Sequence, residues 1–137
     1  MASDVFVDTS AFFAMLDRND QWHEAVKPLV ARLERSGVHI VTTDYVLDET
    51  VTLLQVRGLR YVAGPWLDGI LAGSCEIVWK DAARFDEVRR FYARHADKAW
   101  SFTDCFSFVV MRERGITQSL TADHHFAQAG FERLLGA

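Results

Sequence analysis

The chain has 137 residues, half of them hydrophobic and a quarter charged, and its formal net charge is −4 at pH 7. This composition is typical of a soluble globular protein and excludes a disordered chain, and the length fits one domain over residues 1–137. The acidic balance provides no overall attraction to nucleic acid, so an enzyme acting on nucleic acid needs local basic patches or metal ions here.

Short β-prone runs alternate with helical patterns from one end of the chain to the other. Strands are expected at 5–7, 38–42, 75–79, 119–122 and 131–135, and helices at 11–16, 22–35, 45–57, 65–72, 81–95, 101–114 and 124–129. Pro28 predicts a kink or a late start in the second helix, and Thr43 or Asp44 can cap the third. The alternation predicts a three-layer α/β/α sandwich around a parallel sheet of about five short strands.

The cysteines and the N-terminus indicate the compartment. Cys75 and Cys105 have no CxxC spacing, which favours two buried, reduced thiols over a disulfide or a zinc site. The first apolar run is interrupted by Asp8, so we expect no signal peptide, no transmembrane span and no membrane partner. The expected location is the cytoplasm.

Four acidic residues stand next to element boundaries. Asp8 follows the first strand, Glu49 lies in the helix after the second strand, Asp104 begins a strongly apolar helix, and Asp123 follows the fourth strand. Mg²⁺ and Mn²⁺ prefer carboxylate and water oxygens, and substrate phosphates often complete their coordination. Acids crowded at one sheet edge repel one another without a cation. Such a cluster predicts a metal site and phosphate chemistry.

Each acid also has an alternative role. Asp104 is three residues after Ser101, where a first-turn acid is favoured by the helix dipole. Asp8 and Asp123 can be Asx-turn residues after strands. Spacing does not decide whether Asp48 or Glu49 points inward.

Two further groups of residues were candidates for function. His124 and His125 beside Asp123 suggest a metal ligand set, but no other His or Cys sits at ligand spacing, which favours a surface pair. A helix face and its following turn carry more basic residues than acids. A face of this kind is usually just solvated, but it is also the best local basic patch for contact with an RNA backbone: Arg84, Arg89, Arg90, Arg94 and Lys98.

Four sequence blocks together resemble the PIN-domain family, and most closely its VapC-type toxin ribonucleases. The blocks are VFVDTSAFFAMLD, TTDYVLDETVTLL, WSFTDCFSFVVMRERG and SLTADHHFAQAGFERL, and the resemblance runs from Val5 to Leu134. It implies a parallel sheet between helices and an endoribonuclease that depends on Mg²⁺ or Mn²⁺. It also implies an RNA substrate, an antitoxin protein as partner, and a homodimer.

The resemblance carries over to individual residues. Asp8, Glu49, Asp104 and Asp123 correspond to the four metal-site and catalytic acids of the family, which selects Glu49 over Asp48. Thr9 or Ser10, and Thr103, match polar positions of the pocket. Two features depart from the pattern: the extra acid Asp48, and the Gly64-Pro65 break in the region where such proteins dimerise or bind antitoxin.

Other functions stay open at this point. The chain can be a toxin or a stand-alone nuclease, and a PIN-like module that binds RNA or protein without turnover is the main alternative. A phosphoacceptor receiver domain has similar length and an acidic pocket. It needs an aspartate at the end of its third strand, where this chain has Trp79-Lys80-Asp81.

Overall fold

The computed structural model describes residues 4–136, which form five short strands and seven α-helices. The strands are β1 (Val5–Val7), β2 (Ile40–Thr43), β3 (Glu76–Val78), β4 (Gln118–Leu120) and β5 (Glu132–Arg133). The helices are α1 (Thr9–Leu16), α2 (His23–Ser36), α3 (Asp44–Val56), α4 (Arg60–Gly69), α5 (Ala82–Arg94), α6 (Phe102–Arg114) and α7 (His124–Gln128), and a π-helical turn, η1 (Ile70–Ser74), continues α4. Apart from the fourth helix, the predicted bounds differ from these by about two residues at most.

All five strands run parallel, in the order β3-β2-β1-β4-β5. β1 is central, and its first residue, Val5, pairs with Ile40 of β2 on one side and with Gln118 of β4 on the other. Every residue of β1 is buried, as expected for a strand that is covered on both faces. The predicted parallel sheet is confirmed.

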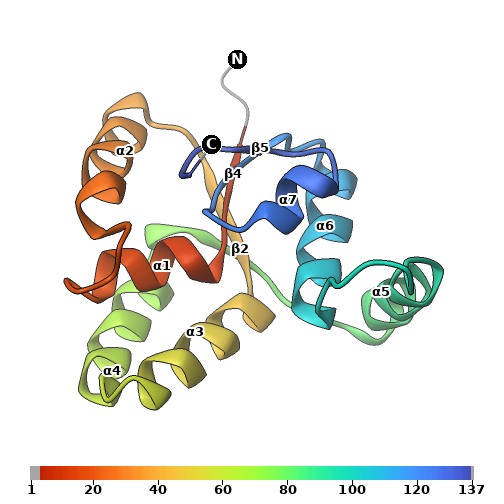
Figure 1. Ribbon diagram of the computed structural model, residues 1–137, viewed down its shortest axis with the longest axis horizontal. Helices are drawn as coiled ribbons and strands as arrows, with labels where there is room; N and C mark the ends of the chain where they lie inside the picture. The colour runs from red at the N-terminus through yellow and green to blue at the C-terminus, as the bar shows by residue number, and fades with distance from the viewer. Residues whose placement is uncertain (1–3, 137) are drawn as a thin grey trace.

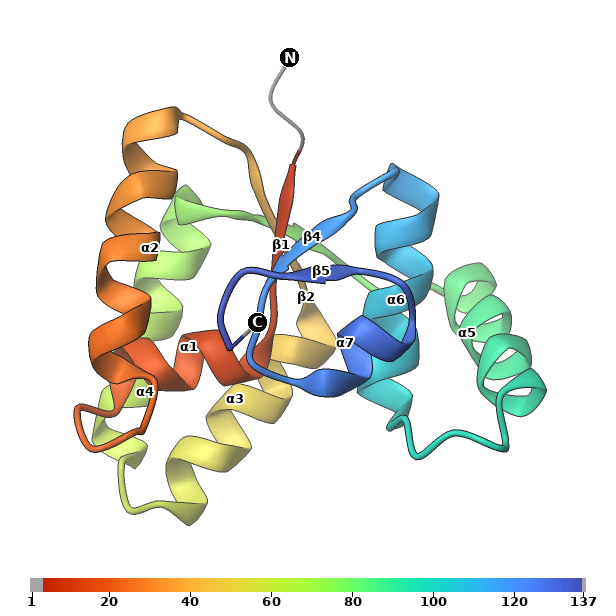
Figure 2. The same cartoon turned by 45° about the horizontal axis from the view of Figure 1, so that its top comes forward.

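Helices cover both sides of the sheet (Figure 1). In the turned view of Figure 2, α1, α2 and α4 lie to the left of the strands, and α5 and α6 lie to the right. α3 continues from the carboxyl end of β2, and α7 connects β4 to β5. This arrangement confirms the predicted three-layer sandwich.

The strand order creates a switch point in the middle of the sheet. The chain leaves β1 towards β2, and it leaves β4 in the opposite direction towards β5. The carboxyl ends of β1 and β4 are adjacent, because Val7 pairs with Leu120. Ligands of open α/β sheets bind at such points. The order also differs from the 2-1-3-4-5 order of receiver domains, which excludes that alternative.

Two helices tolerate a proline that was expected to limit them. α4 begins at Arg60 rather than at Pro65 and contains Pro65, and α2 contains Pro28 without a late start. A proline inside a helix removes one backbone hydrogen bond. In α4 that loss is offset by packing, since the first turn reaches a small hydrophobic cluster made of Phe13, Leu54 and Ala63.

The most deeply buried helix is α6, which lies between the sheet and α5 (Figure 2). All of its residues from Asp104 to Met111 are buried, as expected for a helix that is apolar on most sides. Phe108 packs edge-on against Trp100 and Phe126, with ring centroids 5.0 and 4.9 Å away. This packing fixes the middle of α6 against its neighbours. Of the helices described, none combines the length and the apolar character needed to cross a membrane.

Candidate active site

Asp8 lies where β1 passes into α1, at the switch point. It is the N-cap residue of α1, yet its side chain makes no capping hydrogen bond. Instead Oδ2 accepts hydrogen bonds from the hydroxyls of Thr121, at 2.9 Å, and Ser10, at 3.3 Å. The carboxyl group thus faces the end of β4, which separates it from a turn residue whose side chain only caps its own helix.

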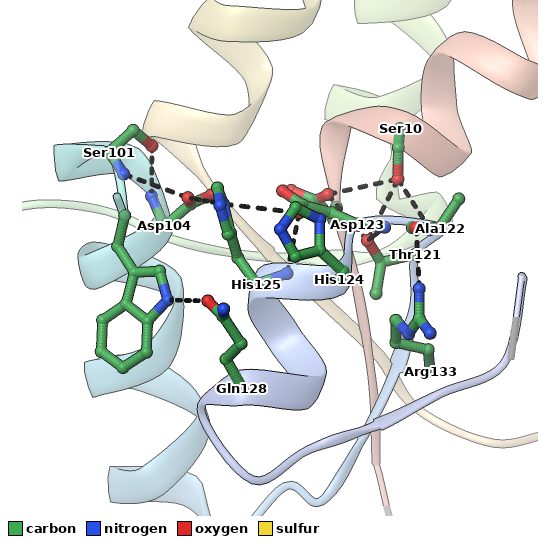
Figure 3. A network of polar contacts seen from close by, with 12 residues as sticks. Ser10, Ser101, Asp104, Thr121, Ala122, Asp123, His124, His125, Gln128 and Arg133 are labelled. Atoms are coloured by element: carbon green, nitrogen blue, oxygen red, sulfur yellow. Dashed lines mark hydrogen bonds and ion pairs between the residues drawn. The ribbon is translucent and has the colours of Figure 1, made fainter. Parts of the chain in front are cut away.

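A small group of hydroxyls connects the two strand ends (Figure 3). The Ser10 and Thr121 oxygens are 3.1 Å apart, Ser10 Oγ accepts from the Ala122 amide at 3.0 Å, and Thr121 Oγ1 accepts from the Asp123 amide at 3.0 Å. Thr121 is fully buried. Sequence reasoning included Ser10 but missed Thr121, whose one signal was a hydroxyl at a strand end, two residues before Asp123.

α3 presents Glu49 towards this edge of the sheet. The helix begins after Thr43, whose hydroxyl accepts from the Val46 amide at 3.1 Å. From that start Glu49 is half-buried, whereas its neighbour Asp48 is exposed. Burial raises the pKa of Glu49, the Thr9 hydroxyl lowers it, and the charges of Asp104 and Asp123 raise it again. These two charges act on Glu49 because the side chains come together in space.

Asp104 is fixed by a capping box at the start of α6. Its amide donates to Ser101 Oγ at 3.0 Å, and its Oδ2 accepts from the Ser101 amide at 3.1 Å. The helix-start role considered from the sequence is therefore real, but it is not the whole role. Burial raises the pKa of Asp104, with the charge of Asp123 adding to the effect. Thr103, just before it, is half-buried, and its carbonyl accepts from Ser107 at 3.1 Å.

Asp123 and the two histidines after it complete the cluster. Asp123 caps α7, and its Oδ1 accepts from the His125 amide at 2.9 Å, which is the turn geometry expected of such a residue. His125 Nδ1 lies 3.1 Å from Asp104 Oδ2 and 3.4 Å from Asp123 Oδ1 (Figure 3). The prediction of a surface pair is therefore wrong for His125, whose side chain is only 20% exposed, and fits His124, which is 69% exposed.

Asp8, Glu49 and Asp104 differ from solvated carboxylates in their electrostatics. The pKa of Asp8 is raised from 3.8 to about 7, mainly by burial; hydrogen bonds from Thr121 and the Thr9 amide oppose this rise, and the charges of Asp104 and Glu49 add to it. Removing carboxylates from water and placing them near one another disfavours their ionised forms. A bound cation reverses this preference, because it offsets both the lost hydration and the mutual repulsion.

The donor set fits a hard divalent cation. In Asp104 and Asp123, the hydrogen bonds with residues 4–136 all use one carboxylate oxygen, which leaves the other oxygen for a ligand. Ligand atoms of Asp123, His124 and His125 also lie within 4.8 Å of one another. Closed zinc sites use four ligands, mostly Cys and His, whereas carboxylate-rich sites suit Mg²⁺ and Mn²⁺. The surrounding acids favour the second type.

The basic patch predicted for RNA contact is largely paired with acids. Arg84 bonds Glu113 at 2.6 Å, and Asp86 bonds both Arg89, at 2.6 Å, and Arg90, at 3.3 Å. The other two cations also have partners in place: Lys98 lies 3.3 Å from Asp97, and Arg94 lies over the ring of Phe91. These pairs reduce the positive charge that the patch offers to phosphate.

The cysteines contribute no nucleophile to this site. Cys105 is buried beside Asp104, and burial raises the pKa of its thiol to about 11, so the thiol stays protonated at neutral pH. Cys75 is also free, but it is half-buried rather than buried as expected.

Comparison with known proteins shows the family and the fold. The family model of the PIN domain matches residues 5–132. The 23S rRNA-specific endonuclease VapC20 of Mycobacterium tuberculosis is 32% identical over 127 residues, which are 93% of this chain and 95% of that protein. A VapC ribonuclease of Archaeoglobus fulgidus is 34% identical over 114 residues, covering 78% of this chain and 69% of that protein. The crystal structure of Mycobacterium tuberculosis VapC20, described as a sarcin-ricin loop cleaving toxin, superposes with a TM-score of 0.85 and 30% identity over 96% of this chain and 99% of that chain.

Proposed function

Because the chain belongs to the PIN-domain family, we propose that it is a single-domain endoribonuclease that requires a divalent metal ion and hydrolyses RNA phosphodiester bonds. The observation that carries the proposal is the gathering of four carboxyl groups at the carboxyl ends of β1 and β4, where burial and the charges of neighbouring acids raise the pKa of Asp8, Glu49 and Asp104. The names of the relatives, which are ribonucleases, favour RNA as the substrate.

The proposal gives each acid a role. Asp8, Glu49 and Asp104 hold one or two Mg²⁺ or Mn²⁺ ions, and Asp123 completes the set. When bound, such an ion lowers the pKa of a water, orients it for in-line attack and neutralises charge on the phosphate oxygens. The hydroxyls of Ser10 and Thr121 hold the Asp8 carboxylate in orientation through its Oδ2.

Three further residues support the acids from behind. His125 lies between the Asp104 and Asp123 carboxylates and keeps both in position. The Thr9 hydroxyl lowers the pKa of Glu49, and the half-buried Thr103, which precedes Asp104, is assigned to the pocket by the same proposal. Partners of this kind fix the orientation of metal ligands, and their loss typically costs about 10- to 100-fold in metal affinity or activity.

The biological role that we propose is that of the toxin in a type II toxin–antitoxin pair. VapC proteins among the relatives support this assignment. It places the protein in the cytoplasm with an antitoxin protein as partner, and the predicted homodimer belongs to the same proposal. A small neighbouring gene that encodes a DNA-binding protein would support the toxin role, and co-purification of the two products would test it directly.

The activity is tested with matched variants of neighbouring acids on α3. Purified protein is incubated with RNA and Mg²⁺ or Mn²⁺, and cleavage is followed by gel electrophoresis. Glu49→Gln should lose cleavage, whereas Asp48→Asn should retain it, because Asp48 is exposed and lies outside the cluster. Chelation of the metal should also stop RNA cleavage by the wild-type protein. Cleavage by Glu49→Gln at the wild-type rate would refute the proposal, and wild-type protein that binds RNA without cutting it would favour the binding module.

A further inference from the structure

A cluster of aromatic side chains stands at the surface beside the acids. It consists of Tyr45, Phe85, Tyr92 and Phe102, and we call it the aromatic cluster. Phe102 is its centre, with ring centroids 5.9 Å from Tyr45, 5.4 Å from Phe85 and 5.6 Å from Tyr92. Phe85 and Tyr92 are 42% and 47% exposed, so each offers ring surface to solvent. The packing of α5 on α6 accounts for the buried part of these rings, but it gives no reason for aromatic residues to be exposed here.

The aromatic cluster borders the candidate active site through α3. Phe102 is the first residue of α6 and lies two positions before Asp104. Tyr45 lies on α3 four positions before Glu49, and residues at that spacing share one helix face with about 5–6 Å between their Cβ atoms. Residues two positions apart point to different sides of a helix, so Phe102 adjoins Asp104 along the chain only, and Tyr45 is the ring that shares a helix face with a proposed metal-site acid.

Trp79 extends this surface along the same edge of the sheet. It directly follows β3, at the carboxyl end of the strand, and is 57% exposed. The next amide, that of Lys80, donates to Asp44 Oδ1 at 3.2 Å, which anchors this segment to the start of α3 beside Tyr45. Lys80 itself is exposed and forms no ion pair with any residue from 4 to 136, so it can meet a phosphate.

Charge makes stacking important for a polyanionic substrate. The net charge of the protein is −4, and the nearest arginines, Arg84 and Arg89, are held by Glu113 and Asp86. Attraction between cations and phosphates is therefore weak on this side of the molecule. Unpaired bases of RNA stack on exposed aromatic rings, and this contribution does not depend on protein charge.

We propose that the aromatic cluster, together with Trp79, is a stacking platform for an unpaired RNA base next to the bond that is cut. The proposal rests on the endoribonuclease function proposed above and extends it: the substrate would be cut in a loop or another single-stranded segment, where a base is free to leave its stack. The platform residues position the RNA and take no part in the chemistry.

The test measures RNA affinity in a Glu49→Gln background, where turnover is blocked. Tyr92→Ala and Trp79→Ala should each weaken binding of a short single-stranded RNA by about 5- to 150-fold, the range for removing one base stack. Tyr92→Phe should restore it, because the ring is kept. The matched control is Tyr61→Ala on α4, which removes a ring that is 77% exposed away from the acids.

A second RNA separates stacking from a structural effect. An oligonucleotide of the same length without bases should bind the Glu49→Gln protein more weakly than the RNA does, and adding Tyr92→Ala should reduce this difference in affinity. In the cleaving protein the same substitutions should raise KM more than they lower kcat.

The outcomes distinguish this proposal from the proposed activity. If the wild type cuts RNA and Tyr92→Ala binds it as tightly as Tyr61→Ala does, the platform is wrong and the nuclease stands. If Tyr92→Ala loses RNA affinity but the wild type cuts nothing, the platform stands and the nuclease is wrong. If light scattering shows that Tyr92→Ala splits a dimer without changing RNA affinity, the surface joins two copies of the chain and the platform is overturned.

Discussion

Replacing Asp8 by asparagine should stabilise the metal-free protein while it abolishes RNA cleavage. The asparagine keeps an oxygen that can accept from Thr121 and Ser10, so the fold should survive. What it removes is a buried carboxyl group whose pKa is raised to about 7 from 3.8, mainly by burial. At about 1.36 kcal/mol per pKa unit, ionising this group in the folded protein costs about 4 kcal/mol, which the variant avoids at alkaline pH.

The pH dependence follows from the direction of this pKa change. The folded protein holds the Asp8 proton more tightly than the unfolded chain does, so wild-type stability is full below the unfolded pKa and falls as pH rises from about 4 to about 7. The advantage of Asp8→Asn should therefore be small, about 1–2 kcal/mol, near pH 5 and should approach about 4 kcal/mol near pH 8. Urea unfolding with EDTA present, at several pH values, measures both proteins directly.

The second part of this test measures the stability of both proteins with a divalent metal ion present. A ligand that binds only the folded protein stabilises it by about 2.7 kcal/mol at 100 times its Kd. Mn²⁺ should therefore raise the wild-type melting temperature and flatten its decline with pH, and it should have little effect on Asp8→Asn. Asp48→Asn serves as the control, because that exposed acid should change neither curve. The reasoning is refuted if metal-free Asp8→Asn is less stable than the wild type near pH 8.

Three other substitutions test how the site is supported. Thr121→Val removes the hydroxyl that donates to Asp8, and we expect a loss of about 10- to 100-fold in metal affinity by titration calorimetry, with Thr121→Ser largely restoring it; equal affinities for Val and Ser would contradict the role of the hydroxyl. Ser101→Ala removes the cap that fixes Asp104, and it should cost about 1 kcal/mol of stability in urea and lower cleavage, whereas unchanged values would show that α6 needs no cap. Phe108→Ala should cost about 3–5 kcal/mol, because the ring is fully buried among other rings, and a loss under about 1 kcal/mol would mean that the core closes around the cavity.

Asp104 and Asp123 each cap a helix and also belong to the proposed metal site. Asp104 belongs to a capping box, and Asp123 caps α7, so each would hold its place without any ligand. Their remaining carboxylate oxygens stay available, because the structural hydrogen bonds within residues 4–136 use one oxygen of each. A cap therefore positions an acid before metal arrives, which lowers the cost of ordering the site.

Local patterns were sufficient to predict most of the elements. Apolar runs, glycines and capping residues act over a few positions, and they placed strands such as β1 and helices such as α6 within about two residues. The start of α4 was missed, because it depends on the contact of its first turn with Phe13 and Leu54, and that contact outweighs the local effect of Pro65. Such tertiary packing has no signal in the sequence near the helix.

For the four acids too, the sequence predicts some features and only the tertiary structure decides the others. The sequence by itself determined that Asp8 and Asp123 follow strands and that Asp104 begins a helix, and parallel strands bring such residues to one edge. Spacing left Asp48 and Glu49 open, the resemblance to the family selected Glu49, and the tertiary structure shows Glu49 half-buried and Asp48 exposed. Only the tertiary structure decided that His125 lies between two carboxylates. It also decided that Thr121 bonds Asp8 across 113 positions of the chain. Hydrogen bonds at that separation depend on strand order and register, because those set which strand ends meet.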